Sequence, residues 1–115
     1  MEFKIPDNCG NSPRMMIVAE LCRAWGEGDQ DYLDAWLAED AVWTTHPEVG
    51  SADIASLELE NVVTHGRVGS CDGIAVRADG SHLHFAHFFR FASTAKTAKV
   101  RAITSYVVVS AQEED

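Results

Sequence analysis

The five histidines are the residues of this 115-residue chain whose chemistry and spacing point most directly to a functional site. Imidazole gains or loses a proton near neutral pH, so converging histidines can act as a general acid and base. His87 alternates with Phe85 and Phe89 along an expected strand, and burial among them favours its neutral form. His65 shares that face by parity, and His46 ends an earlier apolar run. We predict that the three histidines line one pocket, as a general acid/base or polar-recognition set. The alternative is that each is a structural histidine bonded to a backbone carbonyl.

Other residues complete the expected lining of this pocket. Cys9 precedes a helix N-terminus, where the helix dipole can acidify a thiol. Trp43 lies in the first strand expected after the helices, and Tyr106 lies in the last strand. The predicted pocket therefore has His46 and His87 together with six lining residues: Cys9, Trp43, His65, Phe85, Phe89 and Tyr106.

No sequence pattern indicates a cofactor or a complete metal site. His82 and His84 share one strand face and could form a metal pair, but the sequence places no third ligand beside them. The chain lacks a P-loop, a dinucleotide fingerprint, an H-E-x-x-H helix and a Ser-His-Asp order. We therefore expect no cofactor and no metal, and a solvent-facing role for these two histidines.

Charge and cysteine content narrow the classes of partner and compartment. Eighteen Asp and Glu against nine Lys and Arg give a formal charge of −9, which repels nucleic acid and anionic membranes. No apolar run is long enough to span a membrane, and no secretory signal follows Met1. The three cysteines are an odd number without C-x-x-C spacing, which favours reduced thiols. We expect a cytoplasmic protein that binds neither nucleic acid nor membranes.

Two helices are expected near the N-terminus, after an irregular lead-in over residues 1–11. Ser12 and Pro13 are typical of an N-cap and a first helical residue, and apolar residues follow at helical spacing through Trp25 until glycines end the helix. Asp29 can cap a second helix that runs to about residue 40. At the other end, residues 111–115 form an acidic tail.

From residue 41 the pattern is that of strands and turns. Strands are expected over residues 41–45, 57–65, 73–78, 81–92 and 100–110, with Asp79-Gly80 as a hairpin turn. This order indicates a single α+β domain over residues 1–115, in which two helices pack on one face of a curved antiparallel sheet. Because Phe88 faces away from the helices, we expect an apolar outer face and a homodimer.

Several phrases, in order along the chain, resemble the nuclear-transport-factor-2-like superfamily. Residues 24–29 (AWGEGD) and 37–43 (LAEDAVW) look like that superfamily's first helix pair entering its first strand. Residues 9–13 (CGNSP), 64–66 (THG) and 103–107 (ITSYV) are similar to phrases in small bacterial members. The resemblance implies the cone-shaped α+β fold that ketosteroid isomerases and polyketide cyclases share, a fold that hosts many activities.

The resemblance also implies roles for individual residues. In ketosteroid isomerases the base is an aspartate before a proline at the end of strand one, and a protonated aspartate and a tyrosine hold the oxyanion. By position, His46 before Pro47 takes the place of the base, and His87 takes that of the oxyanion aspartate. Leu21 stands at the place of the tyrosine and cannot donate a hydrogen bond. The superfamily's third helix is shortened or missing, because only about ten residues separate the strands that flank it.

These observations favour a small-molecule-binding protein whose ligand is apolar or carries a carbonyl group. If the pocket is catalytic, the resemblance implies proton transfer of the isomerase or cyclase kind. The alternative is a non-catalytic ligand-binding or protein-interaction scaffold. Two histidines that face each other across a closed apolar cavity favour the enzyme, and side chains that fill the cone favour the scaffold.

Overall fold

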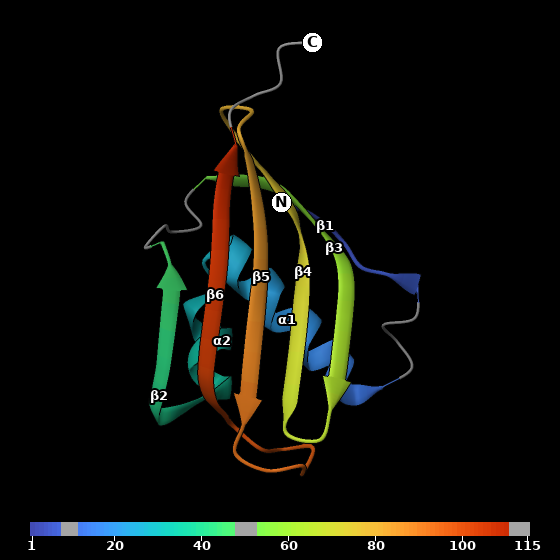
Figure 1. Cartoon of the computed structure of the whole chain (residues 1–115), viewed down its shortest axis with the longest axis vertical. Coiled ribbons are helices and arrows are strands. Elements are labelled where there is room, and N and C mark those ends of the chain that lie inside the picture. The colour runs from blue at the N-terminus through green and yellow to red at the C-terminus, as the bar shows by residue number, and fades with distance from the viewer. Residues whose placement is uncertain (8–11, 48–52, 111–115) are drawn as a thin grey trace.

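The computed structural model describes residues 1–7, 12–47 and 53–110, and in it two helices cover one face of a six-stranded sheet (Figure 1). The strand order is β1-β3-β4-β5-β6-β2. This arrangement confirms the α+β class. The helices are α1 (Pro13–Glu27) and α2 (Gln30–Trp36), and the strands are β1 (Glu2–Lys4), β2 (Leu37–His46), β3 (Ile54–His65), β4 (Val68–Arg77), β5 (His82–Phe91) and β6 (Val100–Ser110).

Local signals set the helix ends. The Ser12 side chain caps α1 by accepting from the Met15 amide, and Gly28 ends the helix in the left-handed region at φ 71°. The Asp29 carboxylate caps α2 by accepting from the Tyr32 amide at 3.2 Å. α2 ends at Trp36, earlier than predicted, so Glu39 and Asp40 lie in β2. Two carboxylates at a helix C-terminus would oppose its dipole, and the early end avoids that arrangement.

The sheet is mixed, whereas an antiparallel sheet was predicted. Strands β3 to β6 pair antiparallel with their neighbours, as expected from the hairpin turns. The two outermost strands pair in parallel, β1 with β3 and β2 with β6. Alternation along a strand shows which face a residue occupies and not the direction of its neighbour, so the sequence pattern did not distinguish these pairings.

The lead-in is also more ordered than predicted. Residues 2–4 form β1 on the edge of β3, with Phe3 opposite Leu57 and packed against the core. The prediction of an irregular segment over residues 1–11 is therefore wrong for these three residues. Residues 8–11, which include Cys9, and the predicted tail 111–115 lie outside the described residues.

Strand β5 divides its side chains between the two faces of the sheet as predicted. Leu83, Phe85, His87, Phe89 and Phe91 are buried under the helices. Phe88 and Arg90 point to the opposite, outer face, where Phe88 is 49% exposed. The core thus lies between α1 and the concave face of β3, β4, β5 and β6.

A bulge in β3 reverses the faces of its last residues. The pairing with β4 shifts between Leu59, opposite Gly73, and Asn61, opposite Asp72. After this extra residue Val62 is buried and Val63 is exposed. The prediction that His65 shares the face of His87 is therefore wrong, because simple parity from Leu59 does not hold across the bulge.

The connection from β2 to β3 is short, as the sequence predicts. β2 ends at His46 and β3 begins at Ile54, and the described residues between them form no helix. Within the described chain, no helix is long and apolar enough to cross a membrane.

Candidate functional site

The structure separates the predicted site residues into two sets on opposite faces of the sheet. Trp43, Phe85, His87 and Phe89 belong to the interior, where they contact one another or the core. His46, His65 and Tyr106 lie on the outer face or its rim and are exposed. The three histidines therefore do not converge, and His46 and His87 do not face each other as the predicted acid/base pair requires.

A hydrogen-bonded chain of three side chains holds His87 in the interior. The indole Nε1–H of Trp43 donates to the Ser105 hydroxyl at 2.9 Å, and the same hydroxyl lies 2.6 Å from His87 Nδ1. The sheet aligns these groups, because Ser105 pairs with His87 on β5 and with Thr45 on β2. Ser105 and His87 are 0% and 1% exposed.

This chain favours the tautomer of His87 in which Ser105 donates to Nδ1, although a hydroxyl oxygen can also accept two hydrogen bonds. Indole N–H can only donate, so the Ser105 oxygen accepts from Trp43, and its own hydrogen is then available for His87 Nδ1. That assignment leaves the ring proton on Nε2, as a donor. Nε2 is buried and has no hydrogen-bond partner within the described residues. The rings of Trp25 and Phe85 lie at 4.5 and 5.2 Å between centroids and occupy the surroundings of the imidazole.

Burial also determines the charge of His87. Desolvation lowers the pKa of this imidazole from 6.5 to about 3, so the ring is neutral at physiological pH. A base whose conjugate acid has so low a pKa removes protons poorly at neutral pH, and the Ser105 hydroxyl beside it is not activated as a nucleophile. The site can donate one hydrogen bond from a neutral imidazole, which is a binding contact.

The outer face carries an aromatic cluster formed by His46, Phe88 and Tyr106. The imidazole of His46 stacks on Tyr106 with 5.5 Å between centroids and 27° between planes. Phe88 meets the same tyrosine edge-on at 6.0 Å. Tyr106 is 48% exposed, and Val42 and Val108 are each 62% exposed. His46, Phe88, Tyr106 and Val108 thus form an apolar and aromatic surface over β2, β5 and β6, and Val42 lies further along β2, opposite Ala102.

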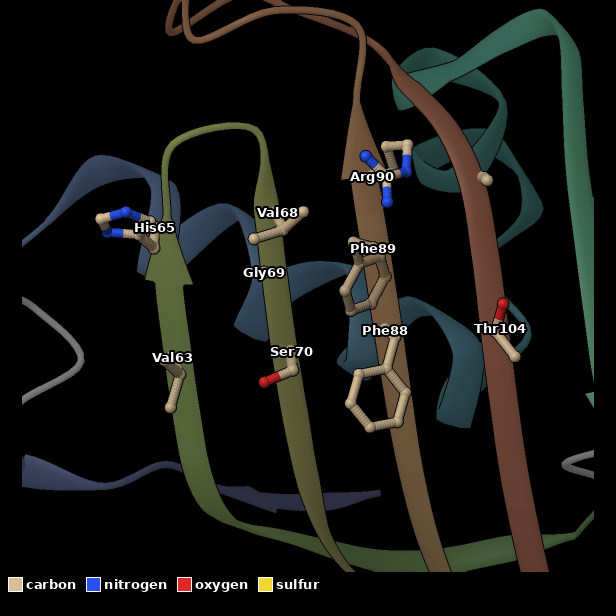
Figure 2. Close-up of a pocket in the computed structure, with 10 residues that line it drawn as sticks. Val63, His65, Val68, Gly69, Ser70, Phe88, Phe89, Arg90 and Thr104 are labelled. Atoms are coloured by element: carbon tan, nitrogen blue, oxygen red, sulfur yellow. The ribbon is translucent and has the colours of Figure 1, made fainter.

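A groove of about 330 Å³ extends this surface toward β3 (Figure 2). Val63 and His65 border it on β3, and Phe88 and Arg90 border it on β5. Ser70 on β4 lies between them with a small outward side chain, and Gly69 lines the groove with its backbone. The groove therefore lies on the face opposite the helices, away from His87.

The β5 and β6 part of the outer face carries no negative charge, although the chain as a whole is acidic. Residues 80–112 contain no Asp or Glu, although the whole chain has eighteen. The outward residues of β5 and β6 are consequently neutral or basic, and Arg90 is the charged residue among those on β5. Two copies of this β5–β6 surface can approach each other without repulsion between carboxylates.

The described cysteines are buried thiols that were not predicted as site residues, and His84 faces outward. Cys22 and Cys71 are free and buried, and burial raises the pKa of the Cys22 thiol, which keeps it protonated. His84 on β5 is exposed and points outward, as expected from its parity. The described residues include no group of three side chains that could hold a metal ion.

Ser105 is the interior residue that sequence reasoning missed. It connects His87 to Trp43, and it follows Thr104 in the ITSYV phrase. Its alternation with Tyr106 was visible, since neighbours on a strand face opposite sides. If Ile103 is taken as a core residue, Ser105 two positions later shares its inner face, and Tyr106 faces outward.

Solved structures share this fold at low sequence identity. An NTF2-like protein of unknown function from Cytophaga hutchinsonii matches with a TM-score of 0.58 and 18% identity, covering 81% of this chain and 97% of that one. One from Burkholderia pseudomallei matches at 0.60 and 20%, covering 82% and 89%, and one from Burkholderia xenovorans at 0.61 and 14%, covering 90% of each. No family model and no curated protein sequence matches the chain. Identities this low establish a shared fold and transfer no activity.

Proposed function

We propose that this chain, which has the NTF2-like fold, is a non-catalytic binding module that works as a homodimer joined through the outer face of its sheet. One observation carries the proposal: the outward residues of β5 and β6 form an exposed apolar surface that includes no carboxylate, in a chain of charge −9. Carboxylates on this face lie on other strands, such as Asp72 on β4 and Glu58 on β3. An exposed cluster such as Phe88, Tyr106 and Val108 is the kind of surface that associating proteins bury.

The size of the face suits a second copy. Four adjacent strands of about ten residues cover roughly 20 by 33 Å, given the usual strand spacing and rise. That area is comparable to the ~800 Å² that each partner buries in a stable interface. A second copy also brings a β5–β6 surface without carboxylates, whereas an arbitrary protein partner has no such constraint.

Replacing Phe88 by glutamate is expected to convert the dimer to a monomer. In a two-fold interface each carboxylate would be buried against apolar groups or close to its symmetry mate, at a cost of several kcal/mol. Light scattering at micromolar concentration should give twice the chain mass of 12.6 kDa for the unchanged protein and 12.6 kDa for Phe88→Glu.

The matched control also replaces an exposed apolar residue by glutamate, but outside the proposed interface. Ile5 is 39% exposed and follows β1, outside the four strands of the proposed interface. Ile5→Glu should leave the mass at the dimer value. A monomeric parent protein, or equal dissociation of both variants, would refute the interface.

A second candidate function rests on His87. A buried imidazole N–H without a partner is costly unless an acceptor reaches it. A neutral ligand with a carbonyl group could supply that acceptor if the aromatic side chains around His87 move apart. The proton-transfer reaction expected from the resemblance would need a second titratable group, and the structure places His46 on the other face.

Binding of a small neutral ketone tests this second candidate. The ketone should raise the melting temperature of the unchanged protein, because it binds the folded state alone. The effect should be the same at pH 8 and pH 6, since His87 is neutral throughout this range. It should be absent in His87→Phe, which fills the site without a donor. Stabilisation that persists in His87→Phe would show that the ketone binds elsewhere.

A further inference from the structure

The basic residues of this acidic chain gather at one end of the molecule. The end is formed by the start of α1, the β3–β4 turn, the end of β5, the following loop and the start of β6, at the bottom of Figure 1. Nine residues of the chain are Lys or Arg. Six of the nine lie on these segments: Arg14, Arg67, Arg90, Lys96, Lys99 and Arg101.

A cavity of about 240 Å³ opens among these segments. Its cationic and titratable lining residues are Arg14 from α1, His65 from the end of β3 and Lys96 from the loop after β5. Three residues with hydroxyl groups also line the cavity: Ser12, Thr64 and Thr94. The lining contains no carboxylate. Its donors come from three segments that are distant in sequence.

Arg14 is held in place and keeps an unused donor. Its guanidinium carbon lies 3.9 Å from the centre of the Phe91 ring, and Nη2 donates to the Ala95 carbonyl at 2.8 Å. Nη1 is buried and has no partner within the described residues. Arg23 shows the contrast, because its guanidinium binds Glu20, Glu27 and Asp29. No carboxylate of the described chain pairs with Arg14 or Lys96.

We propose that this cavity binds the phosphate group of a small phosphate monoester. A buried guanidinium N–H without an acceptor is satisfied best by an anionic oxygen, through a charge-assisted hydrogen bond. Nη1 of Arg14 would make this bond when the guanidinium turns toward the cavity that Arg14 lines. Donors that surround a cavity from three segments match the several oxygens of a tetrahedral dianion better than the two of a planar carboxylate. The first turn of α1, whose Ser12 and Pro13 line the cavity, adds the positive end of a fifteen-residue helix.

The phosphate cavity itself includes neither His87 nor the residues Phe88 and Tyr106 of the proposed interface. His65 lies between this cavity and the outer-face groove and lines both. The organic part of a phosphate ester can therefore extend past His65 onto the apolar groove lined by Val63 and Val68. A ligand that did so would extend along the rim of the proposed interface.

The test is an NMR titration of the full chain with three probes at constant ionic strength. Inorganic phosphate and phenyl phosphate should shift the amide signals of Thr64, Gly66 and Lys96 in a saturable manner, with phenyl phosphate binding more tightly. Acetate should bind at least tenfold more weakly than phosphate. Equal or tighter binding of acetate would overturn the assignment to phosphate.

Variants locate the site. Lys96→Gln should weaken phosphate binding about tenfold or more, the usual loss for one charge-assisted hydrogen bond. Lys4→Gln removes the same charge from β1, outside this cavity, and should leave binding unchanged. Arg14→Gln should abolish saturable binding, provided that its dispersed spectrum shows an intact fold. Equal weakening in Lys96→Gln and Lys4→Gln would show a general charge effect and refute the site.

The same experiment separates a soluble ester from a lipid headgroup. Vesicles of phosphatidylcholine with phosphatidic acid present the same phosphate monoester on a surface. The chain's charge of −9 should keep it from sedimenting with them. Sedimentation with vesicles in the absence of binding to phenyl phosphate would overturn the proposal.

Discussion

Replacing Gly73 by alanine is expected to destabilise the protein by about 3 kcal/mol or more, enough to unfold a large fraction of a marginally stable domain. A Cβ atom at this position would lie 2.0 Å from the Glu58 carbonyl oxygen and 3.0 Å from the Leu59 Cα. Both contacts are with backbone, at the point where the β3 bulge crosses β4. Backbone cannot move aside as a side chain can, so the strain exceeds that of ordinary overpacking. Urea unfolding measured by circular dichroism gives the free-energy difference.

Gly69 provides the control on the same strand. A Cβ there would meet the methyl groups of Val18 at 3.0 Å and Thr64 at 3.4 Å, which belong to side chains. Gly69→Ala should cost about 1 kcal/mol, since these groups can shift slightly. Equal losses for the two substitutions would show that the bulge is not the source of the constraint.

Acidification is expected to destabilise the protein through His87 alone by roughly 3 kcal/mol between pH 6.5 and pH 4. Unfolded imidazole binds a proton below about pH 6.5, whereas the folded-state pKa of His87 is about 3. In this interval the unfolded chain therefore holds more protons at this residue than the folded chain does. Stability falls as the pH is lowered, with a slope of up to about 1.4 kcal/mol per pH unit.

Comparison with His87→Asn isolates this contribution. Asparagine can accept from Ser105 near the position of Nδ1, and it does not titrate. The variant should be less stable than the parent at pH 7, because it leaves a cavity and alters a buried hydrogen bond. Its loss of stability on going to pH 4 should be smaller by roughly 3 kcal/mol. Parallel pH profiles for the two proteins would contradict the burial of a neutral His87.

Much of the fold follows from local patterns that no tertiary contact overrides. The alternation from His82 to Phe91 is uninterrupted, so the burial of His87 and the exposure of Phe88 could both be predicted. The helix caps at Ser12 and Asp29 could also be predicted, because each capping side chain accepts a hydrogen bond from an amide in the first turn of its own helix.

The predicted site failed where position depends on pairing between distant strands. The bulge that turns His65 outward arises from the register of β3 on β4. The one sequence feature associated with it is Gly73, whose position leaves no room for a Cβ atom beside the β3 backbone. His46 was assigned by resemblance, although it is three residues from Trp43 and so faces the other side of β2. The link from His87 through Ser105 needs the register of β5 on β6, which composition and periodicity do not contain.

The parallel pairing of β2 with β6 has a consequence for how the chain folds during synthesis. β3, β4, β5 and β6 follow one another as hairpins, so their contacts close short loops as the chain lengthens. The ribosome synthesises β2 before these four strands, but Trp43 on β2 pairs with Ile103 on β6, the last strand to be synthesised. Until β6 leaves the ribosome, the apolar side of β2 has no partner strand among the described residues, and the Trp43–Ser105–His87 chain cannot form. Closure of this long-range pair is therefore a late, entropically costly step of the kind that slows folding.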